Sequence, residues 1–247
     1  MRMGWFAIAV CAFGVAMAAL APAAWLDHRL DQASGGRLRL VESGGTVWSG
    51  AGRIEVREPD ASRGLSRAIA WRFRPAALLR ARLAFDVDLE GAARSAIPVA
   101  IGIDGVEVGD LDVTLPAELL GLAAPPLGPL RLGGELRVRI PALTIGGGAI
   151  RGRATVLWLE AASAHANVAP LGDYELTAEG RGSSVDARLG TVRGPLQLDG
   201  GLSWTQGRKP VAQATATVPP SHREALVPLL RTIGVERGEG RYELRLP

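Results

Sequence analysis

Apolar and charged residues alternate one by one through most of the chain beyond residue 36. In AIAWRFR, residues 68–74, Ile69, Trp71 and Phe73 share one side of an extended chain, and two arginines occupy the other. The same alternation recurs in residues 82–90, 134–140 and 241–246. A period of two that separates an apolar from a charged face is typical of antiparallel sheet. The alternation therefore restricts this region to a mainly β fold.

Glycine and proline clusters separate the expected strands, for example DGG at 199–201, and no alternating strand-helix pattern appears. Residues 116–122 and 221–233 predict short helices. In the second, Ser221 and Glu224 form a capping box and Gly234 offers a stop. We predict a single N-terminal transmembrane helix followed by a curved antiparallel β-sheet, a groove or open half-barrel, with one or two short helices.

Residues 3–26 carry no charge between Arg2 and Asp27. A helix over this run would be roughly 36 Å long, enough to cross a hydrocarbon core of about 30 Å. Arg2 places the N-terminus in the cytoplasm by the positive-inside rule. Small residues at 19–23 also fit a cleaved signal peptide, and a buried soluble helix is a third reading. We predict an anchor at 1–26, a juxtamembrane linker at 27–36 and an outer β domain at 37–247.

Composition excludes several functions. The formal net charge is +3 and the charges of both signs are interleaved, which disfavours nucleic-acid binding. The only cysteine, Cys11, lies in the apolar run. The histidines are far apart in the sequence, and no metal-ligand spacing or nucleophile elbow appears. The pairs Asp86 with Asp88 and Asp110 with Asp112 fit a solvent-facing strand better than a catalytic or calcium site. We therefore expect no enzyme activity, no cofactor and no metal site.

Trp48, in the segment GGTVWSGAGRI at 44–54, either binds a ligand or fills part of a β core. Trp71 lies in register with Ile69 and Phe73, so we expect it in the core. Val47 and Trp48 are adjacent and face opposite sides of a strand. We predict that Trp48 is mainly structural, at the turn where the sheet begins.

The segments GGTVWSGAGRI and AIAWRFRPAALLRARLAFDVDLEG resemble the opening of the type II secretion system protein N (GspN) family. The matching positions include Gly45, Trp48, Gly50, Trp71, Pro75, Leu78 and Leu79. Later segments at 168–180, 189–204 and 227–246 are similar to that family too, and they contain Gly172, Tyr174 and Tyr242. A weaker similarity relates the first half to AsmA-like β-groove proteins.

The resemblance implies a single-pass inner-membrane protein of a Gram-negative bacterium, with a cytoplasmic N-terminus and a periplasmic β domain. Its partners would be other type II secretion subunits and the inner membrane. It would act by protein–protein contacts, without catalysis, in the export of folded proteins across the outer membrane. The alternative is an AsmA-like lipid-handling protein, which would add lipid as a partner. An open apolar concave face would favour that alternative, and closure by the helix at 221–233 would weaken it.

Overall fold

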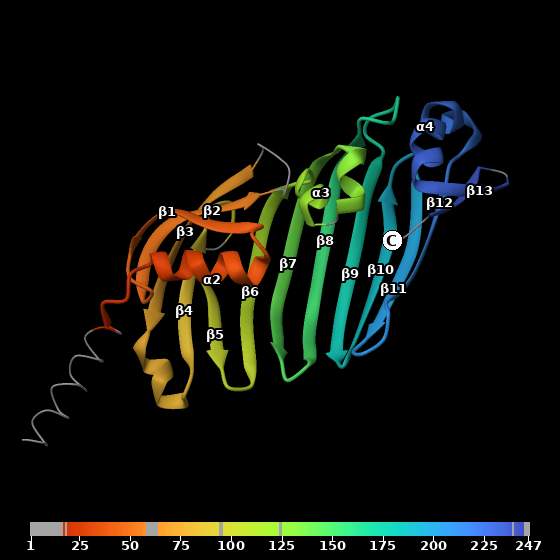
Figure 1. The fold of residues 1–247 in the computed structure, drawn as a ribbon. Coiled ribbons are helices and arrows are strands. Elements are labelled where there is room, and N and C mark those ends of the chain that lie inside the picture. Colours follow the sequence, from red (N-terminus) through yellow and green to blue (C-terminus); the bar gives the residue numbers. More distant parts are fainter. Residues whose placement is uncertain are drawn as a thin grey trace, which may run out of the picture. The chain divides into compact units, whose positions relative to one another are not determined.

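The computed structural model describes residues 17, 19–57, 64–93, 96–123, 125–238 and 240–244. Most of the predicted N-terminal anchor lies outside them. The chain divides into two compact units, Met1–Glu90 and Gly91–Pro247, here called the N-terminal unit and the C-terminal unit. Both are built from antiparallel strands with few short helices (Figure 1). The predicted mainly β, antiparallel class is confirmed, whereas the groove or half-barrel shape stays a prediction.

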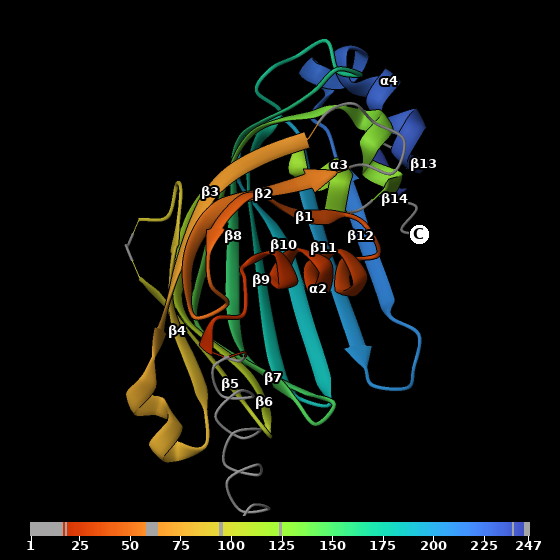
Figure 2. The ribbon, with the colours of Figure 1, turned by 60° about the vertical axis from the view of Figure 1, so that its left-hand side comes forward.

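The N-terminal unit pairs its strands in chain order, β1 to β4. Helix α2 packs against this sheet through Leu26 and Leu30, which contact the small buried cluster of Ala23, Leu40 and Trp71 (Figure 2). The elements are α2 (Ala24–Ser34), β1 (Leu38–Gly45), β2 (Ser49–Arg57), β3 (Gly64–Arg74), the 3₁₀ helix η1 (Pro75–Arg80) and β4 (Leu83–Leu89).

Helix α2 occupies most of the stretch where the sequence predicts a linker. It forms there because Leu26 and Leu30, four residues apart, present one apolar side to the sheet. Gly35, with a φ of 63°, ends the helix in the left-handed conformation that glycine adopts without strain. Among the helices of the described ranges, none is long and apolar enough to cross a membrane.

The C-terminal unit pairs β5 to β12 in chain order, and β14 lies between β12 and β13. Its strands are β5 (Ile97–Gly102), β6 (Gly105–Pro116), β7 (Leu132–Gly146), β8 (Ala149–Ser163), β9 (Gly172–Gly182), β10 (Ser184–Arg193), β11 (Gln197–Thr205), β12 (Val211–Thr217), β13 (Gly234–Gly238) and β14 (Arg241–Leu244). Its helices are α3 (Leu119–Ala123), η2 (Pro125–Leu130), η3 (Pro220–His222) and α4 (Arg223–Ile233).

One face of the C-terminal sheet is apolar along the strands, and its two ends differ. At one end, α4 and the segments around α3 and η2 cover the sheet. There Leu226 and Leu230 of α4 are fully buried together with Tyr174 and Val218. At the other end of the same face, near the β5–β6, β7–β8 and β11–β12 turns and here called the hairpin end, side chains remain 37–48% exposed, namely Ile101, Val106, Ile145 and Leu202.

Helix α4 confirms the predicted apolar stripe and the predicted end at Ile233, but not the predicted start. The capping box is wrong, because the turn η3 precedes the helix and no side chain caps its N-terminus. The hydroxyl of Ser221 pairs instead with Nδ1 of His222 at 2.9 Å. Gly234 directly follows the last helical residue as predicted, but it is extended, with φ −152°, and begins β13 instead of forming a left-handed cap.

Candidate functional site at the aromatic end of the N-terminal unit

The chain enters the N-terminal unit at the turn between β1 and β2. The N–H of Val47 donates to the carbonyl of Ala21 at 2.9 Å, and Pro22 forms a bridge with Thr46. At the same turn, the N–H of Phe73 donates to the carbonyl of Trp48 at 2.6 Å. The entering chain, the β1–β2 turn and the end of β3 therefore lie together. We call this place the aromatic end.

Trp71 and the motif glycines lock the aromatic end together. The indole N–H of Trp71, a residue only 7% exposed, donates to the carbonyl of Thr46 at 3.0 Å. A Cβ on Gly50 would lie 2.6 Å from the Trp71 ring, so only glycine leaves room for the indole. Gly45 has a φ of 92°, and a Cβ there would lie 2.4 Å from the carbonyl oxygen of Ser49. The glycine–tryptophan spacing is thus explained by packing.

Trp48 extends this packing across the strand ends. Its ring lies 4.9 Å from that of Phe73, and the Phe73 ring lies 5.4 Å from that of Phe85. Tilted aromatic pairs at such distances contribute about 0.5–1.5 kcal/mol beyond the area they bury. Trp48 is half-buried. These contacts agree with the expected structural role of Trp48, which stays a prediction.

The remaining motif residues of this unit lie in η1, directly after β3. Pro75 begins this 3₁₀ helix, where its fixed φ suits the first position. Leu78 and Leu79 are 53% and 92% exposed. Ala81, with φ 53°, ends the turn. The two leucines are thus presented outward at the aromatic end, and burial in the sheet does not account for them.

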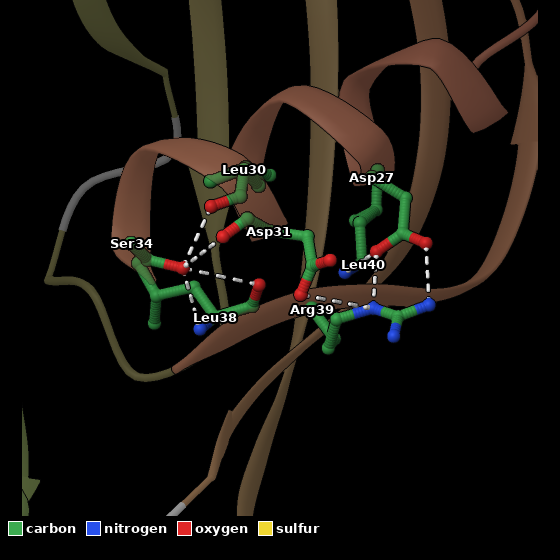
Figure 3. Close-up of polar contacts among 7 residues, drawn as sticks. All are labelled: Asp27, Leu30, Asp31, Ser34, Leu38, Arg39 and Leu40. Carbon is green, nitrogen blue, oxygen red and sulfur yellow. Dashed lines mark hydrogen bonds and ion pairs between the residues drawn. The ribbon is translucent and has the colours of Figure 1, made fainter. Parts of the chain in front are cut away.

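A polar cluster between α2 and β1 was not anticipated from the sequence (Figure 3). Oδ1 of Asp27 accepts from the backbone N–H of Leu40 at 2.8 Å, and both carboxylate oxygens accept from Arg39, at 3.0 and 2.9 Å. The Arg39 hydrogen bond to Asp27 raises the pKa of the guanidinium. Oγ of Ser34 accepts from the N–H of Leu38 at 2.9 Å. Side chains of α2 therefore accept from two N–H groups of β1, those of Leu38 and Leu40.

The C-terminal motif residues Gly172, Tyr174 and Tyr242 lie at the covered end of their own unit. The hydroxyl of Tyr174 donates to the carbonyl of Leu196 at 2.9 Å, and burial raises its pKa. A Cβ on Gly172, whose φ is 152°, would lie 2.5 Å from the carbonyl oxygen of Arg193. The ten motif residues thus form two groups, seven in the N-terminal unit and three in the C-terminal unit.

Asp173, 5% exposed, is the buried acid beside Tyr174 and was missed from the sequence. Its Oδ1 accepts from the N–H of Glu160 at 2.8 Å, and its Oδ2 accepts from Nε of Arg193. The Arg193 hydrogen bond, with that of the Glu160 N–H, lowers the pKa of the Asp173 carboxyl. Glu160 has a φ of 49° where the pairing of β8 with β9 slips, so Asp173 supports an irregular strand.

Three of the side chains considered for catalysis, those of His28, His165 and Asp86, have local partners. His28 pairs with Gln32 at 3.1 Å, and His165 pairs with the carbonyl of Pro129 at 3.0 Å. Asp86 lies 3.1 Å from Arg74 in an ion pair. Asp110 has a φ of 30°, so it does not continue the regular alternation towards Asp112. Within the part of the chain that the structure describes, no group of three or more His, Cys, Asp or Glu could hold a metal ion.

Fold and site together define an antiparallel β protein in which tryptophans and glycines lock the strand ends. Residues 36–245 match the family model described as type II secretion system (T2SS), protein N. The chain therefore belongs to this family and is a type II secretion component, and every motif residue named above lies within the matched region. No curated protein and no solved structure is significantly similar to it. The weaker similarity to AsmA-like proteins stays a prediction.

Proposed function

We propose that the chain is a non-catalytic component of the type II secretion machinery, anchored in the inner membrane by its N-terminal run. Both β units would then lie in the periplasm and act by contacts with other subunits in the export of folded proteins. The observation that carries the proposal is the family match over 36–245, in a chain whose residues 3–26 are free of charge behind Arg2. Such a run fits a membrane-crossing helix with its N-terminus inside.

The strand edges favour side-chain contacts over strand addition. Exposed edges invite pairing, and proteins block them with charges or covering helices. Asp27 and Ser34 of α2 already accept from two backbone N–H groups of β1. β13 is short and carries exposed Glu236 and Arg237. Partner subunits would therefore bind the mixed-charge surfaces of the sheets.

The first test is secretion itself, in a Gram-negative strain lacking this chain. Without it, folded substrates are expected to accumulate in the periplasm, and the wild-type chain should restore their release. A full-length chain with Cys11→Ala and Val211→Cys, at a position 63% exposed, reports topology. An impermeant maleimide should label it in intact spheroplasts. Normal secretion without the chain would overturn the role, and labelling only after lysis would overturn the periplasmic location.

A lipid-handling role is the second candidate, and the open hairpin end of the C-terminal apolar face favours it. Ile145 and Leu202 there are 48% and 38% exposed, whereas α4 closes the other end. Purification of the full-length chain after crosslinking in membranes, with mass spectrometry of proteins and lipids, separates the candidates. Secretion subunits with little lipid support the first. Stoichiometric phospholipid or lipopolysaccharide without those subunits supports the second.

A further inference from the structure

The adjacent leucines of η1, Leu78 and Leu79, are exposed, and packing of the N-terminal unit does not explain their presence. Leu79 is 92% exposed and its neighbour Leu78 is 53% exposed, at the tip of the connection between β3 and β4. Figure 2 shows this short helix projecting beyond the ends of both strands. Large apolar side chains presented together on a projecting turn are typical of a surface that meets an apolar partner.

The location of η1 indicates which partner this is. Phe73, two residues before Pro75, bonds to Trp48 in the turn that also bonds the entering chain at Ala21. η1 therefore lies at the same end of the unit as the point where the charge-free N-terminal run joins it. Leu20 and Trp25, beside this junction, are 74% and 63% exposed. Apolar and indole side chains at one end of a unit fit the interface of a bilayer.

The positive charge around η1 also fits a membrane surface. Residues 70–85 contain no acidic residue, and the arginines in this stretch are Arg72, Arg74, Arg80 and Arg82. Arg80 directly follows the exposed leucines. A membrane surface that carries anionic headgroups attracts such basic segments at short range. Arg74 pairs with Asp86 at 3.1 Å, whereas Arg80 is exposed and adjoins Leu79.

We propose that η1 is a second membrane contact: Leu78 and Leu79 enter the lipid interface and Arg80 meets anionic headgroups beside the anchor. This inference rests on the proposed anchoring of residues 3–26. It adds that the N-terminal unit is held against the bilayer at its aromatic end, so that the unit has a fixed orientation to the membrane. An anchor alone would leave that orientation free.

The test uses the full-length chain with Cys11→Ala, reconstituted in vesicles of phosphatidylethanolamine and phosphatidylglycerol. A fluorescent NBD label is placed at Leu79→Cys, and lipids with a spin label near the headgroup act as quenchers. Leu20→Cys reports the junction with the anchor. Ala33→Cys, exposed at the far end of α2, is the matched control within the same unit.

Quenching at positions 79 and 20 without quenching at position 33 is the expected result. Omitting phosphatidylglycerol should weaken quenching at position 79 more than at position 20. Quenching at position 20 alone would overturn the inference and leave the anchor standing, and the leucines would then fit a protein partner. Absence of quenching at both would overturn the anchor as well. Equal quenching at position 33 would also overturn the inference, since the contact would not be specific to η1.

Discussion

The two units share one local hydrogen bond, made by a tryptophan, but have very different cores. In each, a tryptophan indole donates to a backbone carbonyl 25 residues earlier, Trp71 to Thr46 and Trp158 to Gly133, both at 3.0 Å. In the C-terminal unit, α4 adds buried leucines to a broad cluster around Tyr174. Among the residues that the structure describes, the N-terminal cluster holds three buried ones, and helix α2 contributes half-buried leucines and polar bonds instead.

This difference shows that a covering helix can stabilise a sheet either by burying apolar area or by satisfying backbone hydrogen bonds. Burial of apolar area contributes roughly 25 cal/mol for each Å², so the C-terminal unit gains stability from α4 in proportion to its buried leucines. Helix α2 has less to bury, and it satisfies N–H groups of an edge strand that would otherwise remain open. The units should therefore respond differently to loss of apolar and of polar groups.

The largest effect is expected from Leu226→Ala, which removes a fully buried side chain of α4. Truncation of a buried leucine costs about 2–5 kcal/mol, since a cavity is left behind. Hydrogen exchange with mass spectrometry on the full-length chain in detergent micelles should show a lower opening free energy in β9, β12 and β14. Val211→Ala, 63% exposed, is the control and should change stability by no more than about 0.5 kcal/mol. If both variants lowered the opening free energy equally, burial of leucines by α4 would not be what stabilises the C-terminal unit.

Trp48→Ala tests the smaller aromatic core of the N-terminal unit. It removes the ring that lies 4.9 Å from Phe73. Full burial of a large apolar side chain is worth about 1.5–3 kcal/mol, so a loss of about 2 kcal/mol is expected for this half-buried ring with its aromatic contact. The measurement is the opening free energy of amides in β2 and β3.

Leu79→Ala is the matched control for Trp48→Ala, because it lies at the same end but is exposed. It should leave exchange in β2 and β3 unchanged. If Trp48→Ala kept the stability of these strands but abolished binding of secretion subunits, the structural role of Trp48 would be wrong.

Asp27→Ala tests whether hydrogen bonds from α2 stabilise the N-terminal unit. It removes the acceptor for the N–H of Leu40, and a lost hydrogen bond to a part-buried backbone group costs about 1–2 kcal/mol. Exchange of the Leu40 amide should accelerate more than that of amides in the C-terminal unit. Asp31→Ala is the control, since Asp31 reaches Arg39 only at 4.0 Å. An unchanged Leu40 amide would show that α2 does not protect the edge of β1.

The smallest effect is a pH dependence through Asp173. Its pKa is lowered in the folded chain, so it stabilises the fold fully above the ordinary aspartate pKa of about 3.9. That contribution should be lost as the pH falls from about 3.9 through the lower folded value. Unfolding of the wild type and of Asp173→Asn, followed from neutral to acidic pH, should converge at the acid end. A constant difference between them would contradict this assignment.

The sequence predicted the strands and their faces well, because alternation is a local signal. Trp71 is in the core as expected from its register with Ile69 and Phe73. The predicted turn at DGG was wrong, because Gly200 and Gly201 lie inside β11. A Cβ on Gly200 would lie 2.8 Å from that of Ala214 on β12, so glycine there permits close strand approach. A turn signal and a packing glycine look alike without the neighbouring strand.

The sites also divide into those that local sequence reveals and those that depend on tertiary contacts. The motif around Trp48 and Trp71 could be found from the sequence, since its glycines and tryptophans stand close together along the chain. The Asp27 cluster could not, because Asp27 meets Leu40 and Arg39 only once α2 packs against β1. In the same way, Asp173 meets Arg193 only once β9 pairs with β10. Nothing in the order of these residues marks them as partners.

By itself, the sequence determined the antiparallel β class, the apolar and charged faces, the charge-free run and the family. Each of these follows from short-range periodicity, composition or motif order. Only the tertiary structure decided that α2 covers an edge strand, that α4 closes one end of the C-terminal apolar face, and that Leu79 remains exposed. These depend on contacts between segments distant in the chain, where burial and hydrogen bonding are set by packing and not by local pattern.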